Sequence, residues 1–241
     1  MQTVSLARSP AIGFPFPVAS RSGHTTSPAQ LSGRPMRCAR GTLIYAEGDS
    51  VQDLYKVVSG SIRTYRTLSD GRRLIASFAL PGELFGLDGI GTHRCAAEAV
   101  TDAVMIAFAR KEIEACVERD PLAAKCFQMF ALEKLISEQD RCVLLGRKTA
   151  SERVACFLLD LADRSEGHPH LIDLPMSRYD IGDYLGLSTE TVSRSLTCFR
   201  KRGILADRGP HRVEVLDRDA LEDAASGIET PATDCACLRP V

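Results

Sequence analysis

The sequence predicts an α+β fold in three parts: a small antiparallel β-barrel, a long helix and a C-terminal winged helix-turn-helix. Three observations predict it. Glycines recur at intervals of 12, 11 and 11 residues between positions 48 and 82. A helical stretch without internal Pro or Gly follows at 122–145, and two short capped helices follow at 177–203. A run of strands followed by a run of helices is typical of α+β architecture.

The bulk composition is that of a globular protein. The 241 residues are 44% hydrophobic and 25% charged, and no run approaches the ~20 apolar residues of a membrane-spanning helix. The net charge of −1 argues against a protein that coats polyanions in general, although a specific DNA binder can cluster its basic residues. The nine cysteines are odd in number and form no Cys-x-x-Cys pair. We therefore expect reduced thiols and a cytoplasmic protein.

The first part of the chain is expected to be a disordered arm followed by the barrel. Five arginines and several prolines precede the first acidic residue, which is Glu47. An organelle transit peptide is the alternative to a disordered arm. Residues 40–118 alternate short apolar runs with Gly-containing turns, which is typical of a small barrel.

A dimerisation helix is predicted at 119–146. Asp120-Pro121 starts it, because proline suits the first helical turn. Its apolar stripe is too wide for a helix packed on one neighbour, so one face fits the barrel and the other fits a second subunit. A fully buried core helix is the alternative. The expected interface residues are Leu122, Met129, Ile136 and Val143.

Residues 147–222 are expected to form a winged helix-turn-helix, and 223–241 a disordered tail. Ser177 and Asp180 fit a capping box at the start of the first helix. Gly186 makes the turn, Ser188 caps the second helix, and Gly203 follows its end. Segments 204–206 and 212–215 have the pattern of a β-hairpin wing.

The second helix carries side chains that suit base edges in the DNA major groove. Glu190, Ser193 and Arg194 lie at helical spacings of three or four, opposite an apolar face. A carboxylate accepts a hydrogen bond from cytosine N4, Arg donates twice to guanine, and Ser adapts to either role. We therefore expect these three residues to read bases. The alternative is an amphipathic surface helix with a solvated basic end.

Other side chains near this helix suit the DNA backbone, whose contacts set register without reading sequence. Between Thr191 and Ala206 there are four basic residues and no acidic ones. Cys198 lies in the same helix, where basic neighbours favour a thiolate, and is a candidate redox handle. A packing cysteine is the alternative. The expected backbone contacts are Thr191, Thr197, Arg200, Arg202 and Arg212.

The barrel, long helix and winged helix-turn-helix together resemble the Crp/Fnr superfamily of transcription regulators, over roughly residues 40–222. Glu190-x-x-Ser193-Arg194 after Asp183-Tyr184-Leu185-Gly186-Leu187 is similar to the Fnr/FixK branch, as is Gly82-Glu83-Leu84-Phe85-Gly86-Leu87-Asp88. The resemblance implies a cyclic-nucleotide-binding-type barrel and a homodimer that activates transcription. It also implies that Glu190, Ser193 and Arg194 read inverted TTGA-type half-sites. Double-stranded DNA and RNA polymerase are the partners implied, with no membrane.

We expect a regulator without a bound cofactor, as the resemblance to FixK-like regulators implies. Where a nucleotide phosphate site would lie, the chain has Gly86-Leu87-Asp88 and Arg94-Cys95, without the expected ribose-binding acid. The arm offers only Cys38 to an iron–sulfur cluster, and Met105 stands where a fourth cysteine would fall. His93 is the only barrel histidine, so haem, metal and cupin-type enzyme chemistry are not expected. A cyclic-nucleotide-responsive or redox-responsive regulator is the alternative.

Overall fold

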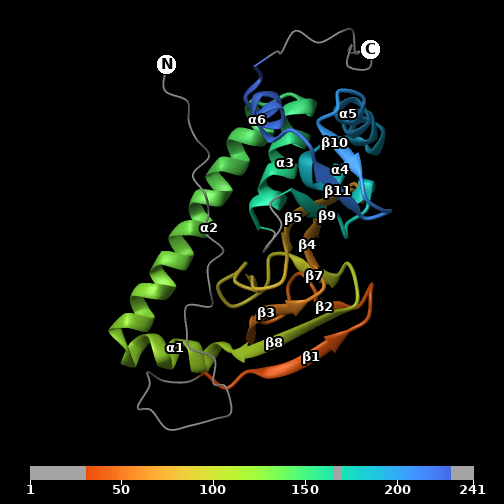
Figure 1. The fold of residues 1–241 in the computed structure, drawn as a ribbon. Helices are drawn as coiled ribbons and strands as arrows, with labels where there is room; N and C mark the ends of the chain where they lie inside the picture. The colour runs from red at the N-terminus through yellow and green to blue at the C-terminus, as the bar shows by residue number, and fades with distance from the viewer. Residues whose placement is uncertain (1–30, 165–169, 229–241) are drawn as a thin grey trace. The chain divides into compact units, whose positions relative to one another are not determined.

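The computed structural model describes residues 31–164 and 170–228 (Figure 1). Two compact units share the chain, and the boundary between them falls at residues 137 and 138, inside the longest helix. The first unit holds the barrel, and the second holds the helix-turn-helix. Each is described separately.

Two four-stranded antiparallel sheets enclose the core of the first unit. One sheet has the order β1-β8-β3-β6 and the other β2-β7-β4-β5. Glycines with positive φ at 48, 60, 71 and 82 make the turns that their spacing predicts. The strands are β1 (Arg34–Cys38), β2 (Leu43–Tyr45), β3 (Asp53–Ser59), β4 (Ile62–Thr67), β5 (Arg73–Ala79), β6 (Leu84–Phe85), β7 (Ala96–Ala99) and β8 (Ala103–Ala109).

Aromatic side chains fill much of the space between these two sheets. The Tyr55 and Phe85 rings stack with centroids 5.0 Å apart, and Tyr45 lies 5.9 Å from Tyr55. All three belong to one buried cluster with Met105, which is fully buried. Stacked rings contribute dispersion as well as burial, so this barrel is a packed core.

The disordered arm predicted to reach residue 39 is too long. Arg34–Cys38 form β1, which pairs in antiparallel register with β8, and Leu31 is buried against the barrel. Met36 and Cys38 alternate toward the core between polar neighbours. Pro35 is accommodated because β1 is an edge strand, where one missing N–H breaks no inner ladder. The Arg and Pro residues concealed this short alternation.

Two helices follow the barrel strands, as predicted. Helix α1 (Arg110–Arg119) buries Ile113 and Cys116, and α2 (Pro121–Arg147) is a single helix of 27 residues. Only Ala123 and Phe130 of α2 are buried in the single chain. The fully buried core helix, considered as the alternative, is therefore wrong.

The second unit contains the four helices α3 to α6 and a three-stranded sheet of order β10-β11-β9. The predicted wing hairpin is present, and β9 adds a third strand to it. Its elements are α3 (Ala150–Arg164), β9 (Leu171–Asp173), α4 (Arg178–Leu185), α5 (Thr189–Lys201), β10 (Leu205–Asp207), β11 (Arg212–Val215) and α6 (Arg218–Ser226).

Helix α6 corrects the predicted start of the tail at residue 223. The Asp217 side chain accepts a hydrogen bond from the Ala220 N–H, and Gly227 ends the helix in the left-handed conformation. Leu221 and Ala225 are buried. The rest of the predicted tail, 229–241, lies outside the described residues. Across the described ranges no helix combines the length and apolar character of a membrane crossing.

Two turn glycines with the same backbone conformation make a stability test of the barrel. Gly60 has φ +82°, and a Cβ there would lie 2.3 Å from the Asp102 carbonyl oxygen. Gly71 has φ +83° and open space around it. We expect Gly71→Ala to lower the free energy of unfolding by about 1 kcal/mol through left-handed strain alone. Gly60→Ala should cost about 1–3 kcal/mol more because the backbone must also move.

Urea unfolding followed by tyrosine fluorescence measures both losses, since the chain has no tryptophan. Equal losses in the two variants would show that the Gly60 turn can relax away from Asp102.

Candidate nucleic-acid interface

The helix-turn-helix is built by capping residues at each of its ends. The Ser177 hydroxyl accepts from the Asp180 N–H, and the Asp180 carboxylate accepts from the Ser177 N–H, which completes the predicted capping box. Gly186 ends α4 at φ 64°, and Ser188 caps α5 through the Thr191 N–H. Local chemistry therefore fixes both ends of the turn.

The three predicted base-reading residues lie together on the exposed face of α5. Glu190, Ser193 and Arg194 are exposed, whereas Val192 and Phe199 are fully buried on the other side. Arg194 Nη2 and Glu190 Oε1 form an ion pair at 2.5 Å. In water such an exposed pair contributes little stability, so its groups can exchange partners for a base edge at low cost.

Two hydroxyls on this face are already committed as donors. Ser193 Oγ donates to the Thr189 carbonyl at 2.9 Å, and Thr197 Oγ1 donates to the Ser193 carbonyl at 2.8 Å. A hydroxyl has one proton and two lone pairs, so both side chains present acceptors outward.

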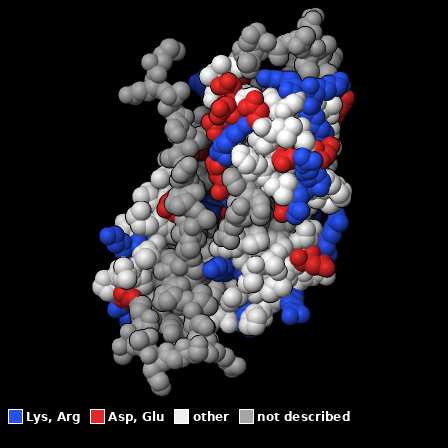
Figure 2. All heavy atoms as spheres, viewed as in Figure 1, with Lys and Arg blue, Asp and Glu red and all other residues white. Residues whose placement is uncertain are grey.

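Two of the predicted backbone contacts are held by ion pairs within the unit. Arg200 contacts Asp207 of β10 at 2.8 Å, and Arg212 contacts Asp173 of β9 at 2.6 Å. The first pair joins α5 to β10, and the second joins β11 to β9 within the wing sheet. A DNA phosphate would have to compete with Asp207 and Asp173 for these guanidiniums. Thr191, Thr197 and Arg202 lie on or at the end of α5. Basic side chains line the edge of this unit where α5 lies (Figure 2).

Cys198 does not suit the redox role considered for it. Its side chain is only 2% exposed and packs on the core side of the helix, so the packing alternative holds. On a helical wheel Cys198 falls at the border of the two faces, and only the packing of the unit decides its burial. Among the other described cysteines, Cys142 is exposed, although its apolar sequence context predicts burial.

Sequence reasoning missed Arg178, in the first turn of α4. Its Nη1 is buried without a hydrogen-bond partner in the part of the chain that the structure describes. Burial, and next the charge of Arg200, lower the pKa of Arg178. A cation at a helix N-terminus is unfavourable to the helix dipole. That unfavourable placement was the signal in the sequence that could have singled out this residue.

Arg153 of α3 also escaped the sequence reasoning, and it joins three segments. Its guanidinium donates to the Leu145 carbonyl in the last turn of α2 at 2.8 Å and to the Lys148 carbonyl at 2.9 Å. A third bond goes to the Leu185 carbonyl, the end of α4, at 3.0 Å. The Leu145 and Leu185 carbonyls lie in the last turns of their helices, where carbonyls have no partner inside the helix, and Lys148 lies between α2 and α3. One charged side chain thus ties α2 and α3 to the helix-turn-helix turn.

The predicted dimer residues are exposed in the single chain. Leu122, Met129, Ile136 and Val143 are 63%, 48%, 47% and 57% exposed and follow one another at intervals of seven residues. Leu132 and Leu135 are exposed beside them. An apolar stripe of this length on one helix is typical of a surface that another helix covers.

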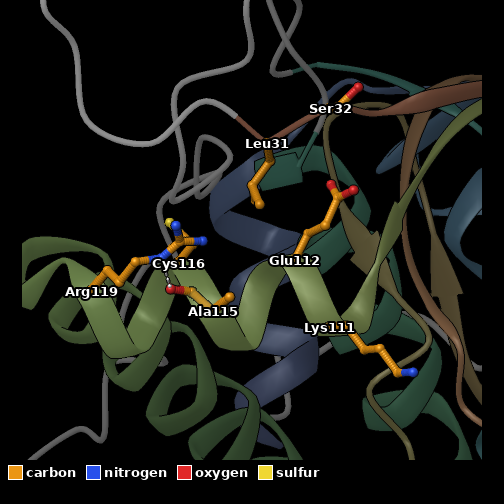
Figure 3. Close-up of a pocket in the computed structure, with 7 residues that line it drawn as sticks. All are labelled: Leu31, Ser32, Lys111, Glu112, Ala115, Cys116 and Arg119. Carbon is orange, nitrogen blue, oxygen red and sulfur yellow. Dashed lines mark hydrogen bonds between the residues drawn. The ribbon is translucent and has the colours of Figure 1, made fainter.

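A hollow beside α1 gathers none of the predicted site residues (Figure 3). Leu31 and Ser32 form one side, and Lys111, Glu112, Ala115, Cys116 and Arg119 form the other. Arg119 Nε donates to the Ala115 carbonyl at 2.8 Å, and burial raises the pKa of the Cys116 thiol. With a carboxylate, two cations and an unreactive thiol, the hollow favours no single ligand charge.

Comparison with known proteins decides the family. A model of the cyclic nucleotide-binding domain matches residues 35–120, and one of the Crp-like helix-turn-helix domain matches 152–224. The nitrogen fixation regulation protein FixK of Rhizobium meliloti (strain 1021) is 40% identical over 196 residues, 80% of this chain and 89% of the relative. The chain belongs to the Crp/Fnr family of transcription regulators.

Two other relatives agree with this chain, one in its fold and one in its sequence. The structure of FixK2 from Bradyrhizobium japonicum has a TM-score of 0.75 and 40% identity, covering 84% of this chain and 100% of that one. The transcriptional activator protein FnrA of Stutzerimonas stutzeri is 36% identical over 202 residues, 81% of each chain. The predicted family and fold class are confirmed, and this Crp/Fnr protein is a DNA-binding transcription regulator.

Replacing Arg153 tests how far this Crp/Fnr interface depends on one side chain. Arg153→Met keeps the length of the apolar stem but leaves two helix-end carbonyls and that of Lys148 without this donor. We expect the free energy of unfolding to fall by about 2–4 kcal/mol. Arg147→Met, at the exposed end of α2, is the matched control and should change it by less than about 0.5 kcal/mol.

Urea denaturation of both variants gives the comparison. Equal stability of Arg153→Met and Arg147→Met would mean that water replaces the guanidinium at the three carbonyls.

Proposed function

We propose that this chain is a cytoplasmic, FixK-like transcription activator that binds inverted TTGA-type half-sites as a homodimer, without a bound cofactor. The observation that carries the proposal is the exposed face of α5, which presents Glu190, Ser193 and Arg194 side by side. Its relatives named FixK and FnrA are a regulator and an activator of transcription.

The three proposed base-reading residues, Glu190, Ser193 and Arg194, suit different groups on the base edges. Arg194 donates two parallel bonds and fits guanine O6 and N7, whereas Glu190 accepts and fits cytosine N4 or adenine N6. Ser193, with its proton committed to Thr189, adds an acceptor. Because a TTGA half-site offers guanine on one strand and cytosine on the other, the donor and the acceptors each have a partner.

Backbone contacts hold α5 in register on the duplex. Thr191, Thr197 and Arg202 are offered by α5 and its end, with Arg212 from the wing. We add Arg178, whose half-buried guanidinium has no partner for Nη1 among the described residues, and Arg200, whose charge acts on it. A phosphate bound between Arg178 and Arg200 would offset the repulsion between these two cations. In the single chain, only the ion pair of Arg200 with Asp207 is seen to offset it among the described residues.

A second copy of the chain supplies the second half-site. Two-fold DNA sites need recognition helices about one helical turn apart, which a dimer provides. The exposed apolar stripe of α2 would be buried in such a pair, and its interval of seven residues suits two parallel helices. Activation implies that surfaces of the dimer contact RNA polymerase.

Single substitutions in the readers test the DNA site. We expect Glu190→Ala, Ser193→Ala and Arg194→Ala each to weaken binding to a TTGAT-NNNN-ATCAA duplex by about 10- to 100-fold, because each removes a base-edge partner. A gel-shift with purified protein, without added nucleotide, measures the affinity. Lys201→Ala, exposed at the end of the same helix, should weaken binding to this duplex and to a scrambled one equally.

Equal losses on the specific and scrambled duplexes for Glu190→Ala and Arg194→Ala would contradict base reading. Binding that requires cyclic AMP would favour the cyclic-nucleotide-responsive alternative over a FixK-like regulator.

A charge placed in the apolar stripe tests the dimer. Ile136→Glu should weaken dimerisation at least about 100-fold, because an unpaired carboxylate would be buried at the interface. Ala131→Glu adds the same charge to an exposed position on the opposite side of α2 and should leave the dimer intact. Sedimentation velocity distinguishes monomer from dimer in both variants. A dimer that persists in Ile136→Glu would place the two-fold contact elsewhere.

A further inference from the structure

The loop between β6 and β7 folds around one carboxylate. Asp88 Oδ2 accepts the backbone N–H of Arg94 at 3.0 Å and that of Cys95 at 2.7 Å. Asp88 Oδ1 lies 2.7 Å from His93 Nδ1. Because an ionised carboxylate only accepts hydrogen bonds, the imidazole must carry its proton on Nδ1. Three donors from three consecutive residues therefore converge on a single anion.

The donors are held by their surroundings as well as by Asp88. His93 is 3% exposed, and its ring stacks on that of Tyr45 with centroids 3.6 Å apart and planes 10° from parallel. The His93 N–H donates to the Asp49 carbonyl, and the His93 carbonyl accepts from the Gly48 N–H, both at 2.8 Å. The imidazole and the backbone around it would thus keep their place if the carboxylate were removed.

Two further observations describe the packing around the Asp88 carboxylate. A Cβ on Gly89 would lie 1.8 Å from the Thr92 carbonyl oxygen, so the loop admits only glycine at its sharpest bend. The buried Tyr45 side chain lies near the same carboxylate: burial, and next the charge of Asp88, raise the pKa of Tyr45. Asp88 therefore acts on the ring that stacks on His93 as well as on its own loop.

We propose that Asp88 is a built-in anionic ligand, filling a cradle that otherwise binds an oxyanion of the phosphate type. Consecutive backbone N–H groups aimed at one point are a general way of binding phosphate. The Asp88 side chain is 19% exposed, so the cradle opens to solvent. Because this carboxylate is tethered, it outcompetes dissolved anions. The barrel therefore keeps the loop ordered without an external effector.

Removing the tethered carboxylate should create a phosphate site. For Asp88→Ala we expect the thermal unfolding midpoint to rise by about 2–4 °C between zero and about 50 mM inorganic phosphate, against chloride at equal ionic strength. The native chain gives the baseline, because phosphate can also bind the basic residues proposed to contact DNA, and the rise of about 2–4 °C is the rise beyond this baseline. Asp102→Ala is the matched control, because the Asp102 carboxylate accepts a single backbone N–H, that of Arg40 at 2.9 Å. It should respond to phosphate no more than the native chain does.

The second variant guards against loss of folding. Asp88→Asn keeps the side chain in the cradle, so it should be less stable than the native chain but respond to phosphate no more than the native chain does. Folding of Asp88→Ala that appears only with phosphate also supports the proposal. An Asp88→Ala chain that responds to phosphate no more than the native chain, or stays unfolded in both salts, overturns it. All variants keep the proposed DNA contacts, so the difference from the native chain is independent of the proposed DNA site.

Discussion

The geometry of the DNA-binding unit depends on Arg153. Its guanidinium satisfies the last carbonyls of α2 and α4 together with the Lys148 carbonyl between α2 and α3. Gly186 packs on the same group, since a Cβ there would lie 3.6 Å from Arg153 Nη1. The negative ends of two helix dipoles and one delocalised cation thus meet at the turn before α5. Arg141 adds a second basic contact, with its guanidinium 4.5 Å from the Tyr184 ring centre.

The barrel and the helix-turn-helix differ in how their charged groups are paired. In the barrel, the Asp88 carboxylate satisfies donors that converge from its own loop, and stacked aromatic rings fill the space between the sheets. On α5 and at the start of α4, Arg194 has an exposed partner, and Arg178 Nη1 has no hydrogen-bond partner among the described residues. Both guanidiniums belong to the unit that is proposed to contact DNA, where bases and phosphates would complete their hydrogen bonds.

Much of this fold follows from local chemistry that is visible in the chain. The turn glycines, the Ser177–Asp180 capping box and the Ser188 cap all act within four residues, so the sequence predicts them correctly. Strand β1 and helix α6 escaped because their pairing and burial come from distant segments. The same is true of Arg153, whose carbonyl partners lie up to 32 residues away. The burial of Cys198 likewise depends on contacts with other segments, which a helical wheel of α5 alone does not show.

The hydroxyl of Ser193 has a consequence for information content. A freely rotating hydroxyl can satisfy a donor or an acceptor and so tolerates any of the four bases. Because its proton is donated to the Thr189 carbonyl of the helix backbone, the same oxygen, in the proposed DNA complex, would favour only bases that offer an N–H. The backbone of α5 would thereby turn an adaptable side chain into a selective one, and the fold itself would limit the bases that Ser193 can accept.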